Sequence, residues 1–145
     1  MRTQEYLDLI NRQREEINNF PICYAFDEKQ LEEALKKLGT TKDECVAIFG
    51  YGDIVKKEDG PKFIEMLKRH TQEVKDRLAA DKNFALAAFL YEMDNYEYAI
   101  NYSGDDDVLG CFGLEMDDLG DMGLDIAYQL AREKHFDHMH DLGVI

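Results

Sequence analysis

One ten-residue segment constrains the fold more than any other. FALAAFLYEM, from Phe84 to Met93, is apolar on nearly every side of a helix. Such a helix is stable in water only when other elements bury most of its surface. The chain of 145 residues has the usual length of one domain and can supply those elements. We therefore predict a single globular domain over residues 1–145, with this helix at the centre of its core.

Apolar residues recur at helical spacing in four further segments. They predict helices over about 3–18, 28–38, 59–78 and 121–139. Asp27 with Gln30 three residues later resembles a capping box, Gly39 suits a helix C-terminus, and Asp81 interrupts the third helix. For the last helix we expect an apolar side made of Leu124, Ala127, Tyr128, Leu130 and Ala131.

Short runs rich in aromatic and β-branched residues predict the strands. These runs lie at 22–26, 45–49, 54–55 and 96–102. The order of elements lacks the regular alternation of strand and helix that a doubly wound sheet requires. The sequence therefore predicts an α+β fold, with a small antiparallel sheet of about three to four strands packed by about five helices.

The negative charge of the chain is unevenly distributed. The formal net charge is −14, yet residues 1–91 hold 17 acids against 15 Lys and Arg, whereas residues 92–145 hold 14 acids against Arg132 and Lys134. From Glu92 to Ala131 there are 11 acids and no Lys or Arg. These carboxylates must face water or a cationic partner, and direct binding to nucleic acid is disfavoured because phosphates require Lys and Arg.

Motifs that carry chemistry are weak in this sequence. Gly50–Asp53 lacks the further glycine and the Lys of a phosphate loop, so we interpret it as a tight turn. The run from Asp105 to Asp107 lacks the acid spacing of a calcium loop and predicts a solvated loop instead. His135, His138 and His140 do not share one helical face, which favours histidines at a helix C-terminus over a metal site.

The cysteines and the apolar pattern indicate the compartment. Cys23, Cys45 and Cys111 are odd in number and far apart, which favours reduced thiols in a cytoplasm. No apolar run approaches the length of a membrane span, and the first residues lack the apolar region of a secretion signal. No catalytic set, cofactor site or metal site emerges, so we predict a binding protein and not an enzyme.

Tyrosines accompany the first acids of the Lys- and Arg-free stretch. Tyr91, Tyr96, Tyr98 and Tyr102 alternate with Glu92, Asp94 and Glu97. A tyrosine ring beside a carboxylate suits an arginine-rich surface, because the ring stacks on the guanidinium while the acid accepts its hydrogen bonds. The alternative is that the alternate tyrosines of a strand pack on the core.

Three segments carry a resemblance to a known group. YAFDEKQLEEALKKLG (24–39), GYGDIVKKED (50–59) and YEMDNYEYAINY (91–102) resemble small acidic proteins of bacteriophages and mobile elements. That group is similar in size and acidity to some anti-CRISPR inhibitors. The resemblance implies a fold and a habitat inside a bacterial host cell, and it assigns no residue a role.

From charge and resemblance we expect an inhibitor of a bacterial defence nuclease, of the anti-CRISPR type. Its carboxylates would occupy the cationic nucleic-acid groove of the target, with a CRISPR effector as the leading partner. The expected partner-binding residues are Glu92, Asp94, Glu97, Asp105, Asp106, Asp107, Glu115, Asp117 and Asp118. The alternative is a structural or regulatory adaptor whose charge serves only solubility and whose aromatic surface binds a neutral protein partner; the sequence leaves the oligomeric state open.

Overall fold

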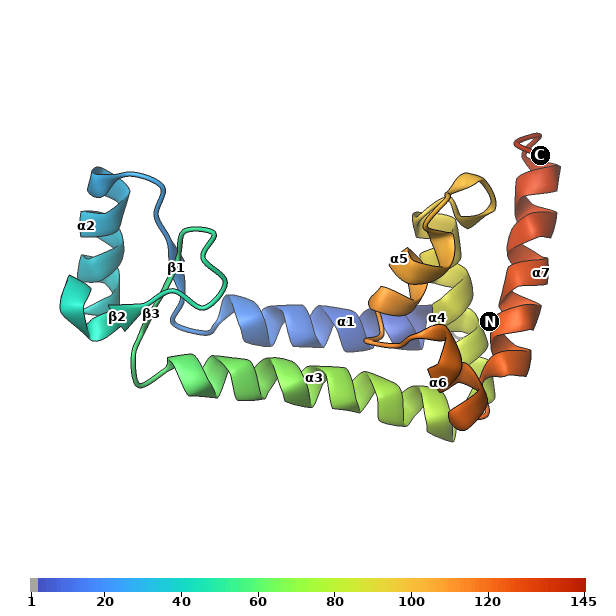
Figure 1. The fold of residues 1–145 in the computed structure, drawn as a ribbon, viewed down its shortest axis with the longest axis horizontal. Helices are drawn as coiled ribbons and strands as arrows, with labels where there is room; N and C mark the ends of the chain where they lie inside the picture. Colours follow the sequence, from blue (N-terminus) through green and yellow to red (C-terminus); the bar gives the residue numbers. More distant parts are fainter. Residues whose placement is uncertain (1–2) are drawn as a thin grey trace. The chain divides into compact units, whose positions relative to one another are not determined.

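The computed structural model describes residues 3–145 and contains, among them, seven α-helices, two 3₁₀-helices and three strands (Figure 1). In chain order these are α1 (Thr3–Asn18), β1 (Cys23–Tyr24), α2 (Glu28–Leu38), η1 (Lys42–Glu44), β2 (Cys45–Val46), β3 (Asp53–Lys56), α3 (Gly60–Ala80), α4 (Lys82–Asn95), η2 (Tyr98–Ile100), α5 (Gly104–Gly110), α6 (Met116–Asp121) and α7 (Asp125–Asp141). The strands form one antiparallel sheet in the order β1-β3-β2. The predicted α+β fold with a small antiparallel sheet is confirmed. No helix within residues 3–145 is long and apolar enough to cross a membrane.

The chain divides into two compact units. Unit 1 comprises the residues up to Arg12 together with His70–Ile145, and unit 2 comprises Gln13–Arg69. The boundaries fall within α1 and α3, so two continuous helices connect the units. Two compact units can belong to one domain or to two, and the single domain therefore stays a prediction.

Unit 2 contains the sheet and α2. Cys23 lies opposite Ile54 and Tyr24 opposite Asp53, while β2 and β3 form a hairpin. Asp27 caps α2 by accepting a hydrogen bond from the backbone N–H of Gln30, and the Gln30 side chain accepts one from the N–H of Phe26. This is a capping box displaced by one residue. The predicted glycine end is confirmed, because Gly39 closes α2 with a φ of 67°.

The predicted strand 45–49 is too long, since β2 ends at Val46. The N–H groups of Ile48 and Phe49 donate to the buried carboxylate of Asp53, at 2.6 and 3.0 Å. Donors bound to a side chain cannot join a β ladder, and the chain turns there instead of continuing the strand. The predicted strand 22–26 is likewise shorter, and only Cys23–Tyr24 pairs with β3.

Unit 1 surrounds α4, as its apolar sequence predicts. Phe84, Phe89 and Met93 have no exposed surface, and α4 packs along α7 (Figure 1). The ring of Phe89 meets Phe112 and Tyr128 edge to face, with 5.2 Å between centroids in both pairs. The predicted break before this helix is also confirmed, because the Asp81 carboxylate caps α4 through the N–H groups of Asn83 and Phe84.

The strand predicted at 96–102 is wrong. α4 continues to Asn95, and the chain then turns through η2. Tyr98 packs against Tyr128, His135 and Phe136 of α7, where no neighbouring strand is available to pair with it. Aromatic residues that have a high strand propensity are here used to cover a helix.

Two further predictions in the last third need correction. The final helix begins at Asp125 and not at Asp121, because Gly123, with a φ of 66°, separates α6 from α7. Ala127, Tyr128 and Ala131 are buried as expected, whereas Leu130 is exposed.

Candidate partner-binding surface

All nine predicted partner-binding acids lie in unit 1, but the structure divides them into two groups. Glu92 belongs to the first group, whose side chains are engaged within the protein. It is 7% exposed, and its Oε2 accepts a hydrogen bond of 2.7 Å from the Tyr6 hydroxyl. Burial, and then this contact with Glu92, raises the pKa of Tyr6. Glu92 is therefore buried and holds α1 against α4, and its role as a partner contact stays a prediction.

Asp105 and Asp107 are structural as well. Asp105 Oδ1 accepts hydrogen bonds from the hydroxyls of Tyr98 and Tyr128, both at 2.6 Å, and Asp107 Oδ2 accepts one of 2.9 Å from the Asn101 amide. Burial, and then Asp105, raises the pKa of both tyrosines. The prediction of a solvated loop is wrong, because residues 105–107 form the first turn of α5. Carboxylates there are favoured by the partial positive charge of a helix N-terminus.

Asp94 joins α4 to α7 through two histidines. Its Oδ1 lies 2.7 Å from Nδ1 of His135, and its Oδ2 lies 3.2 Å from Nδ1 of His138. Nε2 of His135 accepts a hydrogen bond of 2.9 Å from the N–H of Ala99, so the proton of the neutral ring sits on Nδ1 and faces Asp94. His135 is fully buried, which corrects its expected place at the helix end. The spacing of 41 residues between this histidine and Asp94 left no local signal in the sequence.

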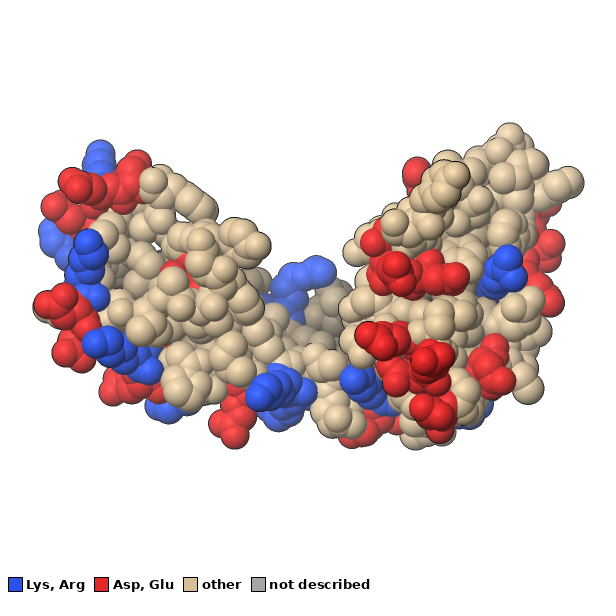
Figure 2. Space-filling model, viewed as in Figure 1, with Lys and Arg blue, Asp and Glu red and all other residues tan. Residues whose placement is uncertain are grey.

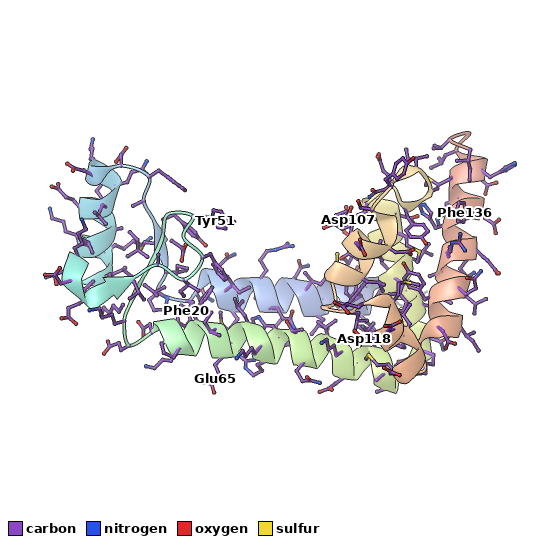
Figure 3. The ribbon with its side chains drawn as sticks, in the orientation of Figure 1. Phe20, Tyr51, Glu65, Asp107, Asp118 and Phe136 are labelled. Carbon is purple, nitrogen blue, oxygen red and sulfur yellow. The ribbon has the colours of Figure 1, made fainter. Side chains whose placement is uncertain are left out.

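Glu115 and Asp118 flank the start of α6. The N–H of Glu115 donates to Asp118 Oδ2 at 2.8 Å, which fixes Asp118 at this turn. Asp118 and Asp117 both lie in the first turn of the helix. Figure 3 labels Asp107 on α5 and Asp118 on α6, the two short helices that start with acids. The concentration of acids in this part of the sequence therefore reflects successive helix N-termini as well as surface charge.

The second group of acids faces solvent. From the predicted set it contains Glu97, Asp106, Glu115 and Asp117, and the sequence prediction missed the exposed Asp121 and Asp125. Figure 2 shows Asp and Glu side chains gathered on the face of unit 1 that carries α5 and α6. Unit 1 holds 19 acids against 7 Lys and Arg, a net of −12, whereas unit 2 holds 12 against 10, a net of −2. The excess negative charge is thus confined to one unit.

An exposed turn accompanies these acids. Residues 96–103 connect α4 to α5 and carry Tyr96, Ile100 and Tyr102 on the surface, Tyr102 being fully exposed. The hydrogen bond from the N–H of Ala99 to His135 attaches this turn to α7. Glu97 is the one non-glycine residue of the described chain with a positive φ, 51°. We define the acidic face as Glu97, Asp106, Glu115, Asp117, Asp121 and Asp125 together with Tyr96, Ile100 and Tyr102 of this turn.

Two groups of unit 1 that could take part in catalysis, Cys111 and His135, are deactivated or engaged in structural bonds. Cys111 is exposed, but burial of its thiol and then the charge of Glu92 raise its pKa to about 11, so little nucleophilic thiolate forms at neutral pH. The two nitrogens of His135 are both committed to structural bonds. Within residues 3–145 no three His, Cys, Asp or Glu side chains converge to hold a metal ion.

Unit 2 contains an open cavity of about 720 Å³. Phe20 (Figure 3), Pro21 and Met66 form its apolar lining. Its polar lining includes the ion pair between Glu16 and Arg69. Cation and carboxylate are paired with each other at this position. Asn19, Lys62 and Glu65 complete its polar lining.

Comparison with known proteins places the chain in a family. A family model, described as a family of unknown function (DUF7659), matches residues 5–139. The chain belongs to DUF7659. The match covers nearly all of both units, so the buried acids and the acidic face lie within the region that defines DUF7659. No curated protein and no solved structure matches the chain.

Proposed function

We propose that this chain is a non-enzymatic binding protein whose acidic face covers a cationic surface of a protein partner. The observation that carries the proposal is the separation of charge, −12 in unit 1 against −2 in unit 2, combined with exposed acids beside exposed tyrosines. Arginine-rich surfaces are complementary to both features, because carboxylates accept guanidinium hydrogen bonds and aromatic rings stack on the guanidinium plane.

The target class that we propose is the nucleic-acid groove of a bacterial defence nuclease, with a CRISPR effector as the leading candidate. Such grooves are lined with Lys and Arg that otherwise neutralise phosphates, and clustered carboxylates can occupy the same positive potential. The protein would then act in the cytoplasm of a bacterial cell. Its three unpaired cysteines are consistent with a reducing compartment.

The test is competition with DNA for a purified CRISPR nuclease loaded with its guide. The wild-type chain should inhibit DNA cleavage, and its binding should weaken by at least about tenfold between about 50 and 200 mM NaCl. A triple variant, Glu97→Lys, Asp106→Lys and Asp117→Lys, should lose about tenfold in affinity and show a flatter salt dependence.

A charge-matched control uses exposed acids of unit 2. The variant Glu32→Lys, Asp43→Lys and Glu58→Lys makes the same change in net charge and should stay within about twofold of wild type. If the two triple variants lose affinity for the nuclease equally, the net charge of the chain and not the acidic face is responsible for binding. Tight binding without salt dependence would instead favour an adaptor, for which the exposed aromatic residues of unit 2 are the supporting observation.

A further inference from the structure

Unit 2 contains a second cavity, between the end of its sheet and the start of α3. The cavity has a volume of about 550 Å³ and is open to solvent. Its apolar lining consists of Val46 in β2, Ile48 just beyond that strand, and Pro61 and Ile64 in α3. We name it the β2–α3 groove. Every residue that lines it belongs to unit 2, so the groove lies within one compact unit.

The charged groups at this groove are mostly positive. Lys57 and Lys68 line it together with one acid, Glu65 (Figure 3), in a chain whose formal net charge is −14. Within residues 3–145 neither lysine ammonium forms an ion pair or a hydrogen bond, whereas Lys62 nearby lies 3.7 Å from Asp59. Two cations without an internal partner thus adjoin an apolar surface, and their potential attracts an anionic group.

The groove adjoins the edge of the sheet. β2 is an outer strand in the order β1-β3-β2, so β3 is the only described strand that pairs with it (Figure 1). An extended peptide binds such an edge through its backbone, and a pocket beside the edge holds its side chain. Gly60 leaves room for that side chain, because a Cβ at this position would already lie 3.5 Å from Cγ2 of Val46.

We propose that the β2–α3 groove binds the C-terminal end of a partner polypeptide. The last side chain of the partner is apolar and lies on Val46 and Ile64, while its terminal carboxylate lies beside Lys57 and Lys68. This contact uses unit 2 and positive charge, so it does not depend on the acidic face of unit 1.

The chemistry of the groove selects this occupant over three others. A neutral apolar segment would leave both lysines without a partner, and a small anion would leave the apolar lining exposed to water. The long chain of a fatty acid needs an enclosed cavity, and this groove is open. A peptide C-terminus buries one side chain and supplies one carboxylate, which matches the lining.

NMR titration of the ¹⁵N-labelled full chain with N-acetyl-threonyl-valyl-leucine tests the proposal. The amide signals of Val46, Ile48, Ile64 and Lys68 should shift, with a Kd on the order of millimolar for so small a peptide. The same peptide with an amidated C-terminus should bind at least about tenfold more weakly, because it lacks the carboxylate. Sodium acetate should leave the signal of Ile64 in place, because it has no apolar side chain.

A pair of lysine variants identifies the cations that are responsible. Lys57→Gln combined with Lys68→Gln should raise the Kd for the free-acid peptide at least about fivefold. Lys29→Gln combined with Lys36→Gln is the control, because it removes the same charge from exposed positions on α2 of the same unit. It should leave the Kd within about twofold of wild type. All four lysines are exposed, so both variants should fold.

Three results would each overturn the proposal. The first is the absence of shifts at the groove up to about 20 mM peptide. The second is equal binding of the free-acid and amidated peptides, or an equal loss in the two lysine pairs, since Lys57 and Lys68 would then not recognise the carboxylate. The third is an acetate titration that reproduces the shifts of the peptide, which would reduce the groove to general attraction of anions.

Discussion

At the scale of single residues, neighbouring acids in one sequence run have opposite roles. Asp105 accepts two tyrosine hydroxyls, whereas Asp106, the next residue, is exposed. A buried hydroxyl that loses its hydrogen-bond acceptor destabilises the fold, because its desolvation free energy is no longer offset by a hydrogen bond. The run Asp105–Asp107 is therefore not a uniform surface charge, and a combined reversal of all three would disturb the fold of unit 1.

We expect Asp105→Ala to lower the free energy of unfolding by about 2 to 4 kcal/mol, because the hydroxyls of Tyr98 and Tyr128 lose their charged acceptor. Asp106→Ala should change it by less than about 0.5 kcal/mol. Urea denaturation of the two variants beside wild type provides the comparison. Equal costs for both variants would show that the hydrogen bonds of Asp105 contribute nothing to stability.

At the scale of elements, α4 is the centre on which unit 1 is built. It supplies Phe84, Phe89 and Met93 to the core and carries Glu92 and Asp94, which bind α1 and α7. α7 shows the limit of periodicity, because Leu130 occupies a position expected to be apolar and yet faces solvent. The number of helices that pack around an element decides how many of its faces are buried.

Phe89→Ala should cost about 3 to 5 kcal/mol, since the ring is fully buried between Phe112 and Tyr128 and its loss leaves a cavity. Leu130→Ala removes a side chain that the sequence also assigns to the apolar side, but it should cost less than about 1 kcal/mol. Denaturant melts measure both. A cost below about 1 kcal/mol for Phe89→Ala would refute the central place of α4.

At the scale of the whole molecule, the two units differ in charge and in the surface they offer. Unit 1 carries the acidic face, and unit 2 exposes four aromatic side chains, those of Tyr24, Phe26, Phe49 and Tyr51. Salt should act on the proposed contact of unit 1, because screening weakens the attraction of its acids to a cationic groove. Ionic strength thus separates the inhibitor from the adaptor, whose binding need not depend on salt.

The charge of unit 1 should also limit its stability at low salt. We expect the thermal midpoint to rise by several degrees between about 20 and 500 mM NaCl as repulsion among its acids is screened. Asp121→Asn should raise stability by about 0.3 to 1 kcal/mol at low salt, because Asp121 ends α6, where negative charge is unfavourable. Calorimetry should find this advantage reduced in high salt; an advantage that is independent of salt would exclude an electrostatic origin.

The sequence by itself determined the elements whose signals are local. The helical spacing of apolar residues, the break at Asp81 and the glycine end at Gly39 act within about four residues, the range over which helix contacts form. For the same reason FALAAFLYEM predicted a helix buried on most faces, and the glycines of the Gly50–Asp53 segment predicted a turn.

Only the tertiary structure decided which acids face solvent and which are hydrogen-bonded within the protein. Glu92 meets Tyr6 across 86 residues, Asp94 meets His135 across 41, and Asp105 meets Tyr128 across 23. It also converted the β-prone stretch 96–102 into a turn covering α7, and it joined Ala25 to Gly52 through a backbone hydrogen bond. Hydrogen bonds and burial of this kind depend on which helices pack together, and that free energy is not contained in any local window of the sequence.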